Sequence, residues 1–346
     1  MGKPAVAAAV HTVSPPIGQV RPPGVIRALR YAGRRCREAW PLLRGALISQ
    51  RYRHHYRRAR RAYRAAGLPV TVTVPLQSLG VRAVRPGDHD SLLALPPDFA
   101  ARVAHGAAAA LDEAEKCDLY PAAAPGDRAT RTDQIAAAAR GEVISIKLRE
   151  PFAIAGLSEL CDPLIDELER TVYGSHVIVD KVYVYRRPAS RQSPGASWLW
   201  HFDNHPREMI KVMVYLTDVG EDQAPFEYVC DAEGRPVLGA PLAPLHGDSR
   251  VAAEQVARVV ANGGRRVVVT GPAGTVIVFD DNVVHCGTLA RVGHRDVVVL
   301  QVRPATFRAT PRLDPRWTGS FGHLNFNRDP RQLTPTPRKP NAAVFQ

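Results

Sequence analysis

The chain lacks both long apolar runs and closely spaced cysteine pairs. A membrane-spanning helix needs about 20 consecutive apolar residues, and no run approaches that length, so we expect no transmembrane segment. The five cysteines are odd in number and form no Cys-x-x-Cys pair. This usage argues against a disulfide framework or a zinc ribbon. It indicates a reducing compartment, which we take to be the cytoplasm.

Acidic residues are almost absent from the first part of the chain. Between Ile26 and Arg64 the only acid is Glu38, against thirteen arginines, so this segment carries +12 of the formal net charge of +13. The remaining chain is therefore close to neutral. Such a separation of charge indicates a basic segment attached to a globular body, and a basic segment is a candidate contact for an anionic partner.

The N-terminal region divides into a leader and a helical segment. Residues 1–24 contain five prolines with little periodicity, and we expect a flexible leader. Residues 25–67 are predicted to form an arginine-rich helical segment whose second helix ends at Gly67. Two interpretations stay open: an aromatic stripe packs on the body while the arginines face water, or residues 26–64 bind an anionic surface of membrane or nucleic acid. The stripe consists of Tyr52, Tyr56 and Tyr63.

From Val177 onward the pattern becomes that of short β-strands separated by glycine turns, which is typical of a double-sheet jelly roll. We predict a mainly β fold with flanking helices (α+β) and a double-stranded β-helix, or cupin-like, core over about residues 140–305. The body covers residues 68–305, and residues 306–346 form a tail rich in proline and arginine, with Trp317, Phe321 and Phe326 as candidate anchors. The predicted strands are Glu142–Leu148, Val177–Arg186, Ser197–Asp203, Met209–Thr217, Pro225–Val229, Arg266–Thr270, Thr275–Phe279 and Arg295–Arg303, and the predicted helices are Pro97–Glu115, Gly156–Tyr173 and Val251–Ala261.

The chain contains a His-x-Asp pattern, His201-Phe-Asp203, and a further histidine, His285, follows 82 residues after Asp203. Along a strand, alternation with period two places His201 and Asp203 on one face. Two histidines and one carboxylate on a rigid β scaffold form the ligand set of non-haem Fe(II) oxygenases, which leaves the remaining metal positions open. We therefore predict these three residues as metal ligands and as the catalytic centre.

The same motifs contain further polar residues that we do not predict to be ligands. His205 lies past the end of the predicted strand and is expected in a loop. Asp280 and Asp281 are expected to be turn residues.

A cation follows the distal histidine. Ten residues after His285, Arg295 opens the last predicted strand. Its guanidinium can bind one carboxylate of a dicarboxylate co-substrate while the other end of that molecule chelates the metal. Arg291 competes for this role, but it precedes Gly293 and is expected in the loop. We therefore predict Arg295 as the anchor.

With these four residues the chain resembles the Fe(II)/2-oxoglutarate-dependent dioxygenases, and most closely their phytanoyl-CoA dioxygenase-like branch, over about residues 140–305. The resemblance implies Fe(II) on the three ligands and 2-oxoglutarate on Arg295. It further implies molecular oxygen as co-substrate, release of succinate and CO2, and hydroxylation of a small-molecule substrate. Co-substrate contacts in this branch come from strands on either side of the His-x-Asp loop, which here carry Tyr183, Tyr215 and, as a weaker candidate, Lys211.

The chain departs from this branch after Val229. The family commonly continues into Pro-Gly-Ser-His, whereas this chain continues Cys230-Asp-Ala-Glu. Because that turn helps to shape the substrate pocket, the family's substrate does not carry over. The alternative hypothesis is a non-catalytic jelly-roll protein that serves as a binding scaffold through its basic helices, and the intact ligand set counts against it.

Overall fold

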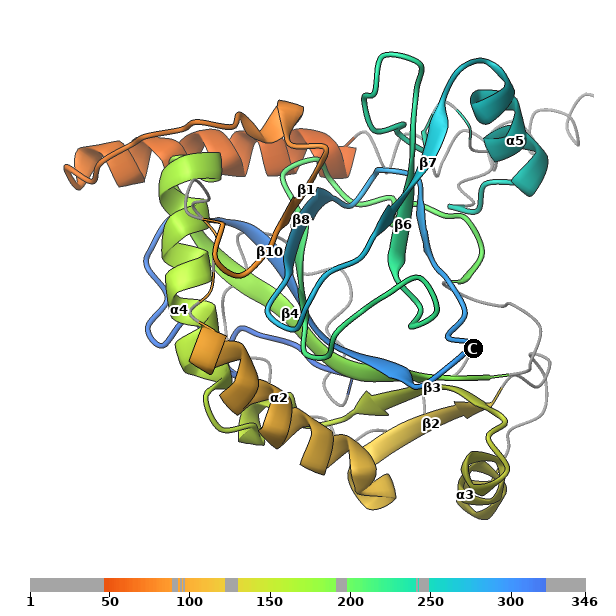
Figure 1. The fold of residues 1–346 in the computed structure, drawn as a ribbon. Helices are drawn as coiled ribbons and strands as arrows, with labels where there is room; N and C mark the ends of the chain where they lie inside the picture. The colour runs from red at the N-terminus through yellow and green to blue at the C-terminus, as the bar shows by residue number, and fades with distance from the viewer. Residues whose placement is uncertain are drawn as a thin grey trace, which may run out of the picture. The chain divides into compact units, whose positions relative to one another are not determined.

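Two antiparallel sheets form the centre of the computed structural model (Figure 1). The structure describes residues 47–321 apart from 89–92, 94, 96, 122–129, 191–197, 241 and 243–248. The expected leader, the first part of the arginine-rich helical segment and Phe326 lie outside the described residues.

The larger sheet has seven strands in the order β1-β8-β5-β10-β4-β3-β2, and the smaller has three in the order β7-β6-β9. This double-sheet arrangement with flanking helices confirms the predicted jelly-roll fold. The strands of the larger sheet are β1 (Val81–Val84), β2 (Cys117–Pro121), β3 (Val143–Leu148), β4 (His176–Pro188), β5 (Ile210–Tyr215), β8 (Val276–Asp280) and β10 (His294–Ala305). Those of the smaller sheet are β6 (Phe226–Cys230), β7 (Arg265–Val269) and β9 (His285–Gly287).

Helices cover one face of the larger sheet, as Figure 1 shows for α2 and α4. Because side chains alternate along a strand, Val298 and Leu300 of β10 pack with these helices, whereas Val297 and Val299 pack with Phe226 of the smaller sheet. Both faces of β10 are therefore buried. The helices are α2 (Pro97–Asp112), α3 (Arg131–Ala139), α4 (Leu157–Leu168) and α5 (Ala253–Ala261), with 3-10 turns η1 (Leu76–Ser78), η2 (Ala114–Lys116) and η3 (Pro151–Ala153) and a π-helical turn η4 (Glu169–Tyr173).

The second basic helix extends over residues 47–65 and packs on the body. Its aromatic stripe is buried, and the Tyr56 hydroxyl donates a hydrogen bond of 2.7 Å to the carbonyl of Tyr173. Six arginines of this helix are exposed: Arg51, Arg53, Arg57, Arg58, Arg61 and Arg64. The packing interpretation of the tyrosines is thus confirmed, and it leaves a cationic face in solvent.

Several predicted boundaries need correction. Of the predicted strand Ser197–Asp203, residues 198–203 form bends and irregular backbone, in which only His201 makes β-bridges. Strand β2 and helix α3 were not predicted, because Cys117–Pro121 and the alanine-rich Arg131–Ala139 show neither clear alternation nor an apolar stripe.

The described part of the tail packs on the body through its aromatic residues. Trp317 packs against a buried cluster of Ile178, Ala305 and Ala309, and the ring centroids of Phe321 and Tyr183 lie 4.5 Å apart. Both residues were expected to anchor this segment. Within the described parts of the chain, no helix combines the length and apolar character that crossing a membrane requires.

Candidate metal centre

A two-residue antiparallel bridge brings the two histidines together. The His201 N–H donates to the His285 carbonyl at 3.0 Å, and the His285 N–H donates back to the His201 carbonyl at 2.9 Å. Reciprocal bonding of this kind places two side chains directly opposite each other on the same face. The imidazole ring centroids accordingly lie 4.4 Å apart.

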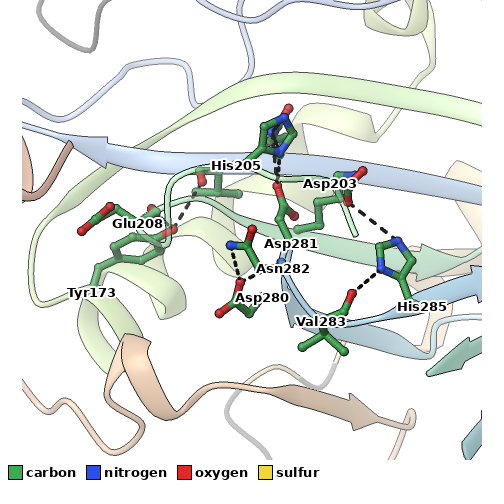
Figure 2. Close-up of polar contacts among 12 residues, drawn as sticks. Tyr173, Asp203, His205, Glu208, Asp280, Asp281, Asn282, Val283 and His285 are labelled. Carbon is green, nitrogen blue, oxygen red and sulfur yellow. Dashed lines mark hydrogen bonds and ion pairs between the residues drawn. The ribbon is translucent and has the colours of Figure 1, made fainter. Parts of the chain in front are cut away.

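Asp203 reaches the same point although its segment is not a strand. Its backbone N–H donates to the carbonyl of Asp281 at 2.8 Å, and the next residue, Asn204, has a left-handed backbone with φ of 55°. Asp203 Oδ2 lies 3.7 Å from His285 Nε2, and Figure 2 shows the two side chains facing each other. One ligand atom from each of His201, Asp203 and His285 lies within 4.8 Å of the other two.

Hydrogen bonds set the tautomers of both histidines. His201 Nδ1 lies 2.8 Å from the Leu199 carbonyl, and His285 Nδ1 lies 2.8 Å from the Val283 carbonyl. A carbonyl only accepts, so Nδ1 carries the proton and Nε2 keeps the lone pair that a metal needs. Burial lowers the pKa of His201 to about 3 and also lowers the pKa of His285, which keeps both rings neutral.

Asp203 carries the anionic charge of the site and is paired with a lysine. Lys211 Nζ of β5 lies 2.6 Å from Asp203 Oδ2. Burial alone would raise the pKa of Asp203, but Lys211 outweighs it and holds this pKa well below its usual range. Burial likewise would lower the pKa of Lys211, but Asp203 and Asp281 raise it above its usual value. Both partners are therefore charged near neutral pH.

This donor set fits a divalent metal ion. It combines two neutral imidazoles with one carboxylate, all held by backbone hydrogen bonds, and the three residues leave further coordination positions open. It is the only group of three such side chains found among the described residues.

Arg295 lies at the start of β10 and is 2% exposed. Its Nε and Nη1 atoms have no hydrogen-bond partner among the described residues. Its cross-strand neighbour is another cation, Arg187, whose pKa is lowered to about 10 by burial, with the charge of Arg295 acting in the same direction. A buried guanidinium with unused donors is costly unless an anion binds it. In contrast, the side chain of Arg291 is 82% exposed and pairs with Asp222.

The two tyrosines occupy different environments. The Tyr215 hydroxyl accepts from the Phe226 N–H at 3.0 Å and donates to the Val269 carbonyl at 2.8 Å, so it links the two sheets. Its ring lies 5.9 Å from the Arg295 guanidinium carbon. Tyr183 packs on the inner face of the larger sheet, and burial raises the pKa of its hydroxyl.

Sequence reasoning missed a polar cluster beside the ligands. His205 Nδ1 lies 2.6 Å from Oδ2 of Asp281, as drawn in Figure 2, and Gln301 Nε2 donates to the same oxygen at 3.3 Å. Asp281 has no exposed surface, so it is more than a turn residue: its backbone holds Asp203 and its carboxylate holds His205. The sequence offered one signal, two adjacent aspartates between an apolar strand and a histidine.

No protein-family model and no curated protein matches the chain. Among solved structures, EctD from S. alaskensis, with 2-oxoglutarate and 5-hydroxyectoine, is 18% identical, with 78% of this chain and 84% of that chain covered and a TM-score of 0.45. AviO1 from Streptomyces viridochromogenes is 20% identical, with 66% and 92% covered and a TM-score of 0.41. The epimerase SnoN, with Fe3+, alpha ketoglutarate and nogalamycin RO, is 14% identical, with 68% and 85% covered and a TM-score of 0.42. The identities and TM-scores of all three structures are low.

The loop of the metal centre depends on the absence of a side chain at Gly239. A Cβ there would overlap the ring of Phe202, which lies between two of the ligands. We expect Gly239→Ala to displace this loop and to weaken Co(II) binding about 10-fold, as lost support of metal ligands typically does. Isothermal titration calorimetry measures the affinity. The control is Gly106→Ala on α2, whose Cβ would meet the Ile154 side chain at 3.3 Å and the Ala155 backbone at ordinary contact distances of 3.8 and 3.9 Å. Equal affinities in the two variants would contradict the expectation.

Proposed function

We propose that the protein is an Fe(II)/2-oxoglutarate-dependent oxygenase of the phytanoyl-CoA dioxygenase-like branch that hydroxylates a small molecule in the cytoplasm. The observation that carries the proposal is the combination of a His–Asp–His ligand set with a buried guanidinium that has unused donors. The first matches the ligand preference of non-haem iron. The second matches a dicarboxylate, because a bidentate carboxylate satisfies two guanidinium N–H groups at once.

Each residue has a distinct role in this proposal. His201, Asp203 and His285 hold Fe(II), which supplies the oxygen chemistry when bound. Arg295 binds the distal carboxylate of 2-oxoglutarate, and the Tyr215 ring, 5.9 Å from the Arg295 guanidinium carbon, packs against that guanidinium. Tyr183 contacts the co-substrate from β4. The surrounding apolar side chains exclude water, which strengthens these electrostatic contacts.

Replacing Asp203 tests the metal site. Asp203→Ala removes the anionic ligand and leaves the buried Lys211 without its counter-ion, so we expect loss of both Fe(II) binding and succinate formation from 2-oxoglutarate. The measurements are metal content after dialysis and succinate yield across a panel of small molecules. Asp222→Ala, at an exposed surface position, is the control. Wild-type turnover in the Asp203 variant would show that the ligand assignment is wrong.

Replacing Arg295 tests the co-substrate anchor. Arg295→Met keeps much of the buried volume but removes a charge-assisted hydrogen-bonded pair worth roughly 1.5–3 kcal/mol, or about 10- to 100-fold in affinity. We expect the KM for 2-oxoglutarate to rise by this factor while Fe(II) binding persists. Arg291→Met should leave the KM unchanged. If the Arg291 variant changed the KM and the Arg295 variant did not, the anchor would be Arg291.

We propose a second role for the helix over residues 47–65, namely contact with a nucleic-acid backbone. Its tyrosine stripe is buried in the body, so the face left in solvent is cationic, and residues 47–67 contain no acid. A membrane-surface helix inserts an apolar face into the lipid, whereas here that face packs on protein. Leu47 is the one large apolar side chain exposed on the described helix, and a face made mainly of arginines suits phosphate contacts, whose strength falls as salt rises.

Charge reversal tests this second role. We expect a variant with glutamate at Arg57, Arg58, Arg61 and Arg64 to lose salt-sensitive binding to mixed-sequence duplex DNA, measured by fluorescence anisotropy, while succinate formation is retained. The control carries the same change at four exposed arginines elsewhere: Arg82, Arg102, Arg140 and Arg291. Equal DNA binding by both variants would contradict the role. Binding to anionic vesicles but not to DNA would assign the face to membranes instead.

A further inference from the structure

Lys211, which the sequence offered as a weaker candidate for a co-substrate contact, is instead paired with Asp203, one of the proposed metal ligands. It lies on β5, opposite Gln301 of β10 and Phe279 of β8, so its side chain points between the two sheets. Its ammonium lies 2.6 Å from Asp203 Oδ2, the same oxygen that lies 3.7 Å from His285 Nε2. Only 16% of the Lys211 side chain and 18% of the Asp203 side chain are exposed, so solvent screens this pair only weakly.

The position of Lys211 changes the net charge that the site presents to a metal ion and to the co-substrate. The Asp203 carboxylate and the Lys211 ammonium cancel, and the two imidazoles are neutral, so these groups together offer no net charge to an incoming cation. A divalent metal ion alone therefore leaves two uncompensated positive charges in a buried site. A dianion that binds next to the metal brings two negative charges that offset the positive charge of the metal, and in the proposed function its distal carboxylate also pairs with Arg295.

We propose that Lys211 couples the two binding events: it weakens metal binding in the absence of 2-oxoglutarate and makes the co-substrate strengthen metal binding. This inference rests on the proposed function. By linkage, the metal raises the affinity for the dianion by the same factor. Lys211 is thus a positioning and charge-balancing residue, and it favours a site in which metal and co-substrate are held together over one loaded with metal alone.

The coupling factor is the quantity to measure. Co(II) is titrated calorimetrically into the full-length protein with and without saturating 2-oxoglutarate, for wild type, Lys211→Met, Lys211→Gln and Lys211→Arg. We expect Lys211→Met to bind Co(II) alone about tenfold more tightly than wild type and to lose about tenfold of the affinity gained from 2-oxoglutarate, within the usual range of such couplings. Lys211→Arg should retain the wild-type coupling because it retains the charge.

Lys211→Gln and a control at Lys147 separate the effect of the Lys211 charge from the effect of losing its hydrogen bond to Asp203. Lys211→Gln keeps an N–H donor for Asp203 without the charge, so its Co(II) affinity and coupling should match those of Lys211→Met. If Lys211→Met does not fold, Lys211→Gln provides the same test. Lys147→Met is the matched control: Lys147 lies on β3, its ammonium 4.0 Å from the Tyr120 ring centroid, and its loss should leave Co(II) binding and coupling unchanged.

The outcomes distinguish the inference from the proposed function. If both neutral variants bind Co(II) more weakly than wild type and the effect of 2-oxoglutarate is unaltered, Lys211 only orients Asp203 and the inference is overturned. If Co(II) binds normally but 2-oxoglutarate has no effect on it in any variant, including wild type, the inference is overturned while the metal site stands. If wild type binds no Co(II), the proposed function itself fails.

Discussion

The reciprocal backbone pairing of His201 and His285 is the constraint on which the site depends. These residues are far apart in sequence, and two hydrogen bonds of 3.0 and 2.9 Å place their rings on one face. Strand β9, which carries His285, pairs with β6, and β6 is joined to the larger sheet through the Tyr215 hydroxyl. The site is therefore as rigid as the packing between the two sheets.

Charged side chains gather in two places on the inner face of the sheets, one near the paired histidines and one at the start of β10. Near the ligands, Asp203 and Lys211 neutralise each other, and Asp281 holds the loop through its backbone and through His205. At the start of β10, Arg295 lies beside Arg187, and the Nε and Nη1 donors of Arg295 are unused among the described residues. Under the proposed function, the His–Asp–His group and the Arg295 guanidinium would bind a molecule that presents both a chelating group and a distant carboxylate.

The second basic helix, over residues 47–65, has one face packed on the body and one face in solvent. Its tyrosines supply apolar area to the core, and the Tyr56 hydroxyl closes a buried hydrogen bond. The arginines between them necessarily face outward, because a helix repeats every 3.6 residues. The sequence left open whether the tyrosines pack on the body with the arginines in water or the segment binds an anionic surface, and the buried tyrosines and exposed arginines agree with the first of these.

The sequence by itself determined the fold class, most strand positions and the residue types of the site. Alternation of apolar residues reports which face of a strand is buried, and that information is local. Tertiary structure alone decided how His201 and Asp203 converge, since their segment is a turn held by Asp281 and Gly239 rather than a strand. It alone revealed the Lys211–Asp203 pair and the unused donors of Arg295, because burial and pairing between distant strands depend on contacts that no local pattern encodes.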